Sequence, residues 1–197
     1  SLLHSSQVRV INFEVIAISY CEANPVFKPA GLTGRFLSQS RVSWCMSGYC
    51  LGSDALRDKL GDGIVGDDIR EDQIQPSSFE PRLGSEAYVL DAELNGLFRP
   101  DDRRKISTSI DRLDGDHKQR VDLSEGYELK QGFTYLIPLQ ETVRLADDEY
   151  VKSSPKSSLG RLFLQTRLLA DYNLGFDEIH QHRGRALDTY LLVQPMV

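Results

Sequence analysis

The feature of this chain that most restricts its fold is a series of short apolar segments separated by turn residues. After about Gly61 the sequence shows no sustained helical period, and short runs of β-branched and aromatic residues alternate with Gly, Pro, Asp and Asn. Runs of this kind are typical of strands joined by turns. They occur at residues 87–90, 127–129, 133–137, 142–145, 162–167 and 189–193. The sequence therefore predicts an all-β domain, built as a barrel or a sandwich.

The first 60 residues have a different character and are interpreted as an atypical N-terminal extension of a domain that covers residues 61–197. They contain an apolar, strand-like segment at 8–20 and a Pro- and Gly-rich loop at 25–34. A short helix is predicted at 53–60. Ser53 is expected to act as its N-cap, Asp54 suits its first turn, and Gly61 is expected to stop it.

Residues 91–122 form a long polar stretch with many charges and few aromatic residues. By composition this is a surface insertion. Within it, Arg103-Arg104-Lys105 follows Asp101-Asp102, and this mixture of signs favours a solvated loop over a binding patch.

Size and charge limit the classes of function. The 197 residues suffice for one domain of about 150 residues plus an extension. The net charge of −6 argues against a protein that binds nucleic-acid backbones, because such proteins carry an excess of clustered Lys and Arg. No stretch approaches the roughly 18 consecutive apolar residues of a membrane span. We therefore expect neither nucleic acid nor membrane as a partner.

The three cysteines, Cys21, Cys45 and Cys50, are odd in number and irregular in spacing. This pattern favours reduced thiols and a cytoplasmic location over a disulfide framework. It also lacks the paired-cysteine motif with which zinc deaminases hold their metal. His180 and His182 are expected to be exposed loop residues rather than ligands, so no metal site is predicted on the chain itself.

The segment Lys156-Ser157-Ser158-Leu159-Gly160-Arg161 has the composition of an anion-binding site. Hydroxyl and backbone N–H groups suit phosphate oxygens, and the planar guanidinium of Arg161 can bind phosphate through two hydrogen bonds. The alternatives are that both serines bond to their own backbone in a turn, and that Arg161 pairs with a surface acid.

Four separated segments together resemble one family. They are residues 72–84, 132–139, 154–161 and Phe176-Asp177, and they resemble the dCTP deaminases of the dUTPase superfamily. The likeness is to the first half of the long bacterial form, in which two such domains follow one another, and it covers roughly residues 60–197. It implies a distorted β-barrel of the dUTPase-like (β-clip) type with a short helix. It also implies a homo-oligomer, a trimer or pseudo-trimer, or else a second domain beyond Val197, and a domain truncated at its C-terminal end.

The resemblance implies hydrolytic deamination of dCTP to dUTP without zinc, with Mg²⁺ bound through the substrate triphosphate. Ser157 would position the attacking water or the edge of the base, and Arg161 would orient the catalytic carboxylate or stabilise charge that develops on the ring. The remaining nucleotide contacts implied are Lys156 and Ser158 to phosphate, Gly160, and Asp177 near the sugar or the water.

The catalytic acid is the main departure from the family. The family has a glutamate in a strand after Asp177. In one register Leu192 replaces it, and in the other Asp188 supplies a carboxylate that is one methylene shorter. Leucine cannot transfer protons, and reacting geometry is sensitive to shifts of about 1 Å. Asp188 is therefore the candidate acid.

Three functions follow from these observations. The first is dCTP deamination with Ser157, Arg161 and Asp188 as catalytic residues. The second is a non-catalytic partner domain that binds dCTP or dUTP but has lost the acid. The third is dUTPase-type diphosphate hydrolysis, in which Asp177 would activate a water for attack on phosphorus.

Overall fold

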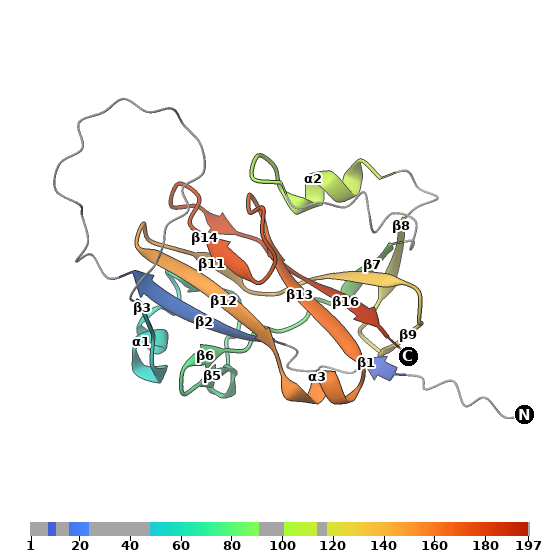
Figure 1. Cartoon of the computed structure of the whole chain (residues 1–197), viewed down its shortest axis with the longest axis horizontal. Helices are drawn as coiled ribbons and strands as arrows, with labels where there is room; N and C mark the ends of the chain where they lie inside the picture. The colour runs from blue at the N-terminus through green and yellow to red at the C-terminus, as the bar shows by residue number, and fades with distance from the viewer. Residues whose placement is uncertain (1–7, 11–15, 24–47, 91–100, 114–117, 197) are drawn as a thin grey trace, which may run out of the picture.

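The computed structural model describes residues 8–10, 16–23, 48–90, 101–113 and 118–196, and strands are its main elements (Figure 1). The strands are β1 (Val8–Val10), β2 (Ile16–Ala23), β3 (Gly48–Cys50), β4 (Ile64–Val65), β5 (Ile74–Gln75), β6 (Ser78–Phe79), β7 (Glu86–Leu90), β8 (Lys118–Asp122), β9 (Tyr127–Leu129), β10 (Thr134–Pro138), β11 (Thr142–Arg144), β12 (Glu149–Pro155), β13 (Leu164–Ala170), β14 (Glu178–His180), β15 (Ala186–Leu187) and β16 (Thr189–Pro195). The helices are α1 (Ser53–Asp58), the 3-10 turn η1 (Glu71–Gln73), α2 (Ile106–Asp111) and α3 (Ser157–Arg161).

Two large antiparallel sheets carry most of these strands. One has the order β13-β16-β10-β7-β8, and the other has the order β14-β12-β2-β6-β5 with β3 also paired to β2. Figure 1 shows β2 and β12 running side by side, which agrees with their seven-residue register from Glu149↔Glu22 to Pro155↔Ile16. Smaller sheets join β15-β11-β4 and β1-β9.

The predicted all-β class is confirmed. The strands expected at residues 87–90, 127–129, 133–137, 142–145 and 189–193 are present with small shifts of their ends. The strand expected at 162–167 begins instead at Leu164, because Leu162 and Phe163 form the turn that ends α3. The described strands follow open hydrogen-bonded paths rather than one closed ring.

The main core lies between the sheets and includes the fully buried side chains of Phe79, Tyr135, Leu168 and Leu191. Side chains alternate along β16, so Leu191 and Val193 enter this core while Tyr190 and Leu192 face the opposite side. The two faces of one strand therefore belong to two different clusters.

Helix α1 contributes to the same core through Leu56. The expected helix is present, but its N-cap is Gly52 rather than Ser53, and Ser53 is the first helical residue. The backbone N–H of Ser53 donates to Pro76 O at 3.0 Å, which fixes the entry of the chain by a long-range contact that the local sequence does not reveal.

Residues 73–84 form a buried polar scaffold. Glu141, only 1% exposed, accepts hydrogen bonds from Gln73 Nε2 at 2.9 Å and from Arg82 N and Nε at 2.8 and 2.7 Å. Gly84 lies against β10, where a Cβ would come within 2.8 Å of Pro138 O, so only glycine fits there. The first of the resembling segments thus has a structural reason for its composition.

The polar stretch at 91–122 is not simply a surface insertion, which corrects the interpretation from composition. Its last part is β8, which pairs with β7 and completes the five-stranded sheet. Ile106 and Ile110 of α2 are buried against the outer face of that sheet, in a second apolar cluster with Leu136, Leu169 and Tyr190. A few apolar side chains within a polar stretch are enough to anchor α2.

In the part of the chain that the structure describes, no helix is long and apolar enough to cross a membrane.

Candidate functional site

Helix α3 presents the predicted anion-binding segment to solvent. Leu159, 3% exposed, anchors the helix in the core, while Ser157, Ser158, Gly160 and Arg161 are exposed. Among described residues, neither serine hydroxyl has a hydrogen-bond partner, and Arg161 has no ion-pair partner. The two structural alternatives, turn-bonded serines and a surface ion pair of Arg161, are therefore not observed.

Lys156 precedes α3 and is less free than its neighbours. Its Nζ lies 2.6 Å from Oε2 of Glu80, whose side chain is 5% exposed. A buried carboxylate needs a cation beside it, so this ion pair attaches the start of α3 to the strand region after β6. Lys156 could contact a phosphate only while it also neutralises Glu80.

Asp177 has a structural role. It has a left-handed backbone (φ 64°), and its Oδ1 accepts hydrogen bonds from Leu168 N at 2.9 Å and Ser153 Oγ at 3.2 Å. Its Oδ2 lies 2.5 Å from a guanidinium nitrogen of Arg167. With both oxygens engaged, Asp177 ties β12 to β13 and has little capacity to activate a water.

Asp188 lies between β15 and β16, beside the start of α2. Lys105 Nζ is 2.9 Å from Asp188 Oδ2 and 3.5 Å from Oδ2 of Asp171, so one ammonium group bridges two carboxylates. Asp188 raises the pKa of Lys105 by accepting its hydrogen bond. Lys105 lies in an exposed loop, as expected, but its two carboxylate partners are far away in the sequence.

Asp171 is the buried member of this cluster, at 1% exposed. Its Oδ1 accepts the backbone N–H of Ile106 at 2.8 Å and so satisfies the first turn of α2. Burial raises the pKa of the Asp171 carboxyl above its usual range, and the nearby Lys105 only partly opposes this effect. A carboxyl with a raised pKa that lies beside a second carboxyl is a common arrangement in acid–base sites.

The structure does not bring Asp188 and α3 together within one chain. The β13–β16 ladder runs from Leu164↔Pro195, next to α3, to Ala170↔Thr189, next to Asp188. Six residue steps of a strand span about 20 Å. Figure 1 likewise shows α3 and α2 on opposite sides of the molecule. One chain therefore carries the hydroxyl cluster at one end of the ladder and the candidate acid at the other.

The face of β16 that would carry an acid in the other register is covered. Tyr190 and Leu192 lie in the apolar cluster beneath α2. Burial and the nearby Asp171 and Asp188 raise the pKa of Tyr190, so its phenol stays protonated at neutral pH. Leu192 is thus part of a packed interface.

Sequence reasoning missed Lys105, Asp171 and Glu80. Lys105 belonged to a segment interpreted as polar surface, and Asp171 and Glu80 were given no role. Each acquires its role through a partner 66 or more positions away. The spacing of charges along the chain holds no signal for such pairs. Within the described ranges, no group of three or more His, Cys, Asp and Glu side chains is placed to hold a metal ion.

The fold and the exposed Ser-Ser-Leu-Gly-Arg helix define a class of β-rich nucleotide enzymes. Residues 50–196 match the family model of the 2'-deoxycytidine 5'-triphosphate deaminase (DCD) N-terminal domain. The chain belongs to this family, and the expected resemblance is confirmed.

Solved and curated relatives agree. The crystal structure of 2'-deoxycytidine 5'-triphosphate deaminase from Agrobacterium tumefaciens superposes with a TM-score of 0.64 at 35% identity, over 74% of this chain and 41% of that one. The "dCTP deaminase, dUMP-forming" of Methanobrevibacter smithii is 29% identical over 62% of this chain and 61% of its own length. The protein of that name from Beutenbergia cavernae is 30% identical over 59% and 57%. These relatives are enzymes, and the chain spans about 60% or less of the length of each.

Proposed function

We propose that this chain binds dCTP and contributes to hydrolytic deamination of its cytosine ring without zinc. The observation that carries the proposal is a set of exposed groups on α3 that have no partner among the described residues: the hydroxyls of Ser157 and Ser158 and the guanidinium of Arg161. Two hydroxyls and a guanidinium that face solvent together on one short helix suit the oxygens of an anionic ligand.

The chemistry requires a water, a carboxylate and stabilisation of charge. Water adds to C4 of cytosine, the carboxylate takes a proton from the water and passes it on, and ammonia leaves as the C4 oxygen forms. Ser157 would hold the water by a hydrogen bond, Arg161 would stabilise negative charge, and Asp188 would move the proton. Ser158 and Lys156 would contact phosphate, and Gly160 would let the backbone approach it.

We further propose that Asp188 reaches this site from a second copy of the fold. The two parts of the machinery lie about 20 Å apart within one chain, as the six steps of β13 imply. A trimer, a pseudo-trimer or a second domain of the same fold could place the Asp188 end of one unit beside α3 of the next.

Mg²⁺ would arrive with the triphosphate. Residues 156–161 carry hydroxyls and cations and no carboxylate, so this segment fits phosphate oxygens better than a bare cation. Mg²⁺ is usually bound partly through substrate phosphates. Here it would neutralise the phosphate charge that faces the chain's own donors.

The second candidate function is a non-catalytic nucleotide-binding partner. The observation in its favour is that α2 covers Tyr190 and Leu192, while Asp188 is paired with Lys105. A domain of this kind would bind dCTP through α3 without turning it over. A Leu192→Glu variant would then lose stability rather than gain activity, since a charge would enter a packed cluster.

The experiment is incubation of the purified chain with dCTP and Mg²⁺, followed by chromatography of the products. Formation of dUTP supports deamination alone. Formation of dUMP and pyrophosphate would assign to this chain the reaction that the names of two relatives describe. Binding of dCTP without product would support the partner domain, and absence of binding would exclude both candidates.

Arg161→Ala tests the site itself. We expect dCTP affinity or turnover to fall by more than tenfold, which exceeds the effect of an exposed ion pair, about 1 kcal/mol at most. Arg144→Ala, which removes an exposed arginine paired with Asp62, is the matched control. Unchanged affinity and rate in the Arg161 variant would contradict the assignment.

A further inference from the structure

The loop between β14 and β15 contains a turn whose sequence does not suit its backbone. The N–H of Arg185 donates to His182 O at 3.1 Å, and both central residues have positive φ, 55° at Arg183 and 65° at Gly184. These values describe a type I′ turn, in which Asn-Gly and Gly-Gly are favoured. Gly184 fits, but an arginine in the left-handed region is strained. A non-glycine residue held in this region suggests a role for its side chain.

In the described part of the chain, the acidic residues near this turn pair with other cations and leave the two arginines of the turn without an acidic partner. The four nearby acids, Asp101, Asp102, Asp171 and Asp188, each lie within 4 Å of Arg103, Arg104 or Lys105. Arg183 and Arg185 are both exposed, and neither has an ion-pair partner among the residues described. In a chain with a net charge of −6, two unneutralised arginines at one turn are unusual.

An aromatic stack holds the turn in place. The rings of Tyr172 and His182 are stacked with centroids 4.5 Å apart and an interplanar angle of 10°, and the guanidinium of Arg185 lies 5.9 Å over the Tyr172 ring. This cation–π contact draws the Arg185 guanidinium toward the Tyr172 ring and leaves it without an ion-pair partner among the described residues.

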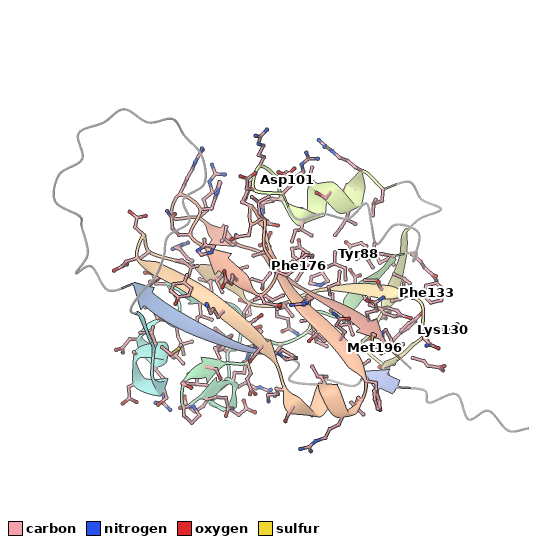
Figure 2. All side chains as sticks on the ribbon, viewed as in Figure 1. Tyr88, Asp101, Lys130, Phe133, Phe176 and Met196 are labelled. Atoms are coloured by element: carbon pink, nitrogen blue, oxygen red, sulfur yellow. The ribbon has the colours of Figure 1, made fainter. Side chains whose placement is uncertain are left out.

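We propose that the turn formed by residues 182–185 binds the phosphate chain of a small polyphosphate, with Arg183 and Arg185 as its charged donors. The turn carries two arginines two positions apart, which suits an extended anion better than a single carboxylate. This surface adjoins the start of α2. Figure 2 shows Asp101, the partner of Arg104, on the side of the molecule away from α3.

Inorganic triphosphate has no base, so its binding can be measured independently of deamination. Titration calorimetry would measure binding of inorganic triphosphate to the whole chain at low salt. We expect Arg183→Asn to weaken this binding by about tenfold or more, as loss of a charge-assisted hydrogen bond does. The same substitution should leave the melting temperature unchanged or raise it, because asparagine tolerates the left-handed region. Arg112→Ala, at an exposed arginine that ends α2, should leave affinity unchanged.

Either of two binding results would overturn the proposal: no binding of triphosphate to the parent chain, or equal affinity of the Arg183→Asn variant. A lower melting temperature together with weaker binding would also overturn it, because Arg183 would then be structural. Parallel titration with dCTP separates the sources of the phosphate. If the variant weakens both ligands, the turn binds a nucleotide triphosphate. If it weakens only the inorganic ligand, the turn binds free polyphosphate. If the chain does not deaminate dCTP but still binds triphosphate through Arg183, the proposed function fails and the proposal for this turn holds.

Discussion

Among single residues, Asp171 links the stability of the domain to pH. Its pKa is raised above the ordinary value of 3.8, chiefly by burial. Because of the raised pKa, the carboxyl stays protonated to a higher pH in the folded state than in the unfolded state. The contribution of Asp171 to stability is then fully present below pH 3.8 and is lost as pH rises through the folded pKa. Each unit of the shift corresponds to about 1.4 kcal/mol.

An Asp171→Asn variant tests this dependence. The amide oxygen can still accept the N–H of Ile106, but the side chain no longer titrates. The free energy of unfolding of the parent minus that of the variant should decrease from pH 3 to pH 7 in urea titrations. Asp122→Asn should show the opposite trend, because hydrogen bonds from the backbone and side chain of Ser124 lower the pKa of Asp122. A flat difference for Asp171 would contradict the prediction.

Glu141 and Arg82 form a buried pair whose loss should be costly. Glu141 is 1% exposed and Arg82 is 23% exposed, with 2.7 Å between Nε and Oε1. Arg82→Met would leave a buried charge without its cation, which costs about 3–5 kcal/mol of unfolding free energy. Arg144→Met, at an exposed pair, should cost less than about 1 kcal/mol. Similar losses in the two variants, measured by urea unfolding, would show that Glu141 is solvated after Arg82 is removed.

At the scale of elements, one substitution in α3 is expected to change stability and nucleotide binding in opposite directions. A Cβ on Gly160 would meet no heavy atom within 4 Å, so Gly160→Ala should stabilise the helix by about 0.5–1 kcal/mol. If the backbone of Gly160 approaches phosphate, the same methyl group should weaken dCTP binding. Thermal unfolding and calorimetry of one variant measure both effects.

Gly52→Ala is the control for this test, since its Cβ would meet only Pro76 O at 3.8 Å, an ordinary contact. Its dCTP affinity should equal that of the parent. Equal affinity in the Gly160 variant, together with higher stability, would remove Gly160 from the nucleotide contacts.

At the scale of the whole molecule, a site that combines α3 of one copy with Asp188 of another can be distinguished from a site within one chain. Ser157→Ala and Asp188→Asn should each abolish turnover of dCTP. Co-expression of the two variants should restore about a quarter of the parent activity, because one in four random neighbours combines an intact Ser157 with an intact Asp188. Co-purification through an affinity tag on one variant would confirm that mixed oligomers form. Mixed oligomers without activity would contradict the composite arrangement.

The short strands could be predicted from the sequence because their signals are local. Alternation of side chains and turn residues act over a few positions, and the segments at 87–90 and 189–193 were found in this way. The α3 segment was also recognisable, since its serines, glycine and arginine are contiguous and all face solvent. The placement of α2 and β8 was not, because long-range burial of Ile106 and Ile110 outweighs a polar composition.

The sequence by itself determined the all-β class, the family and the residues of α3. Only the tertiary structure decided what surrounds the candidate acid: Lys105 bridges Asp188 to the buried Asp171, and α2 covers Tyr190 and Leu192. It also decided that Asp188 lies a full strand away from α3. The physical reason is that strand signals arise between neighbours in the chain. The ion pairs of Lys105 and the packing of α2 over Tyr190 and Leu192 depend instead on segments 66 or more positions apart, which meet only when the sheets form.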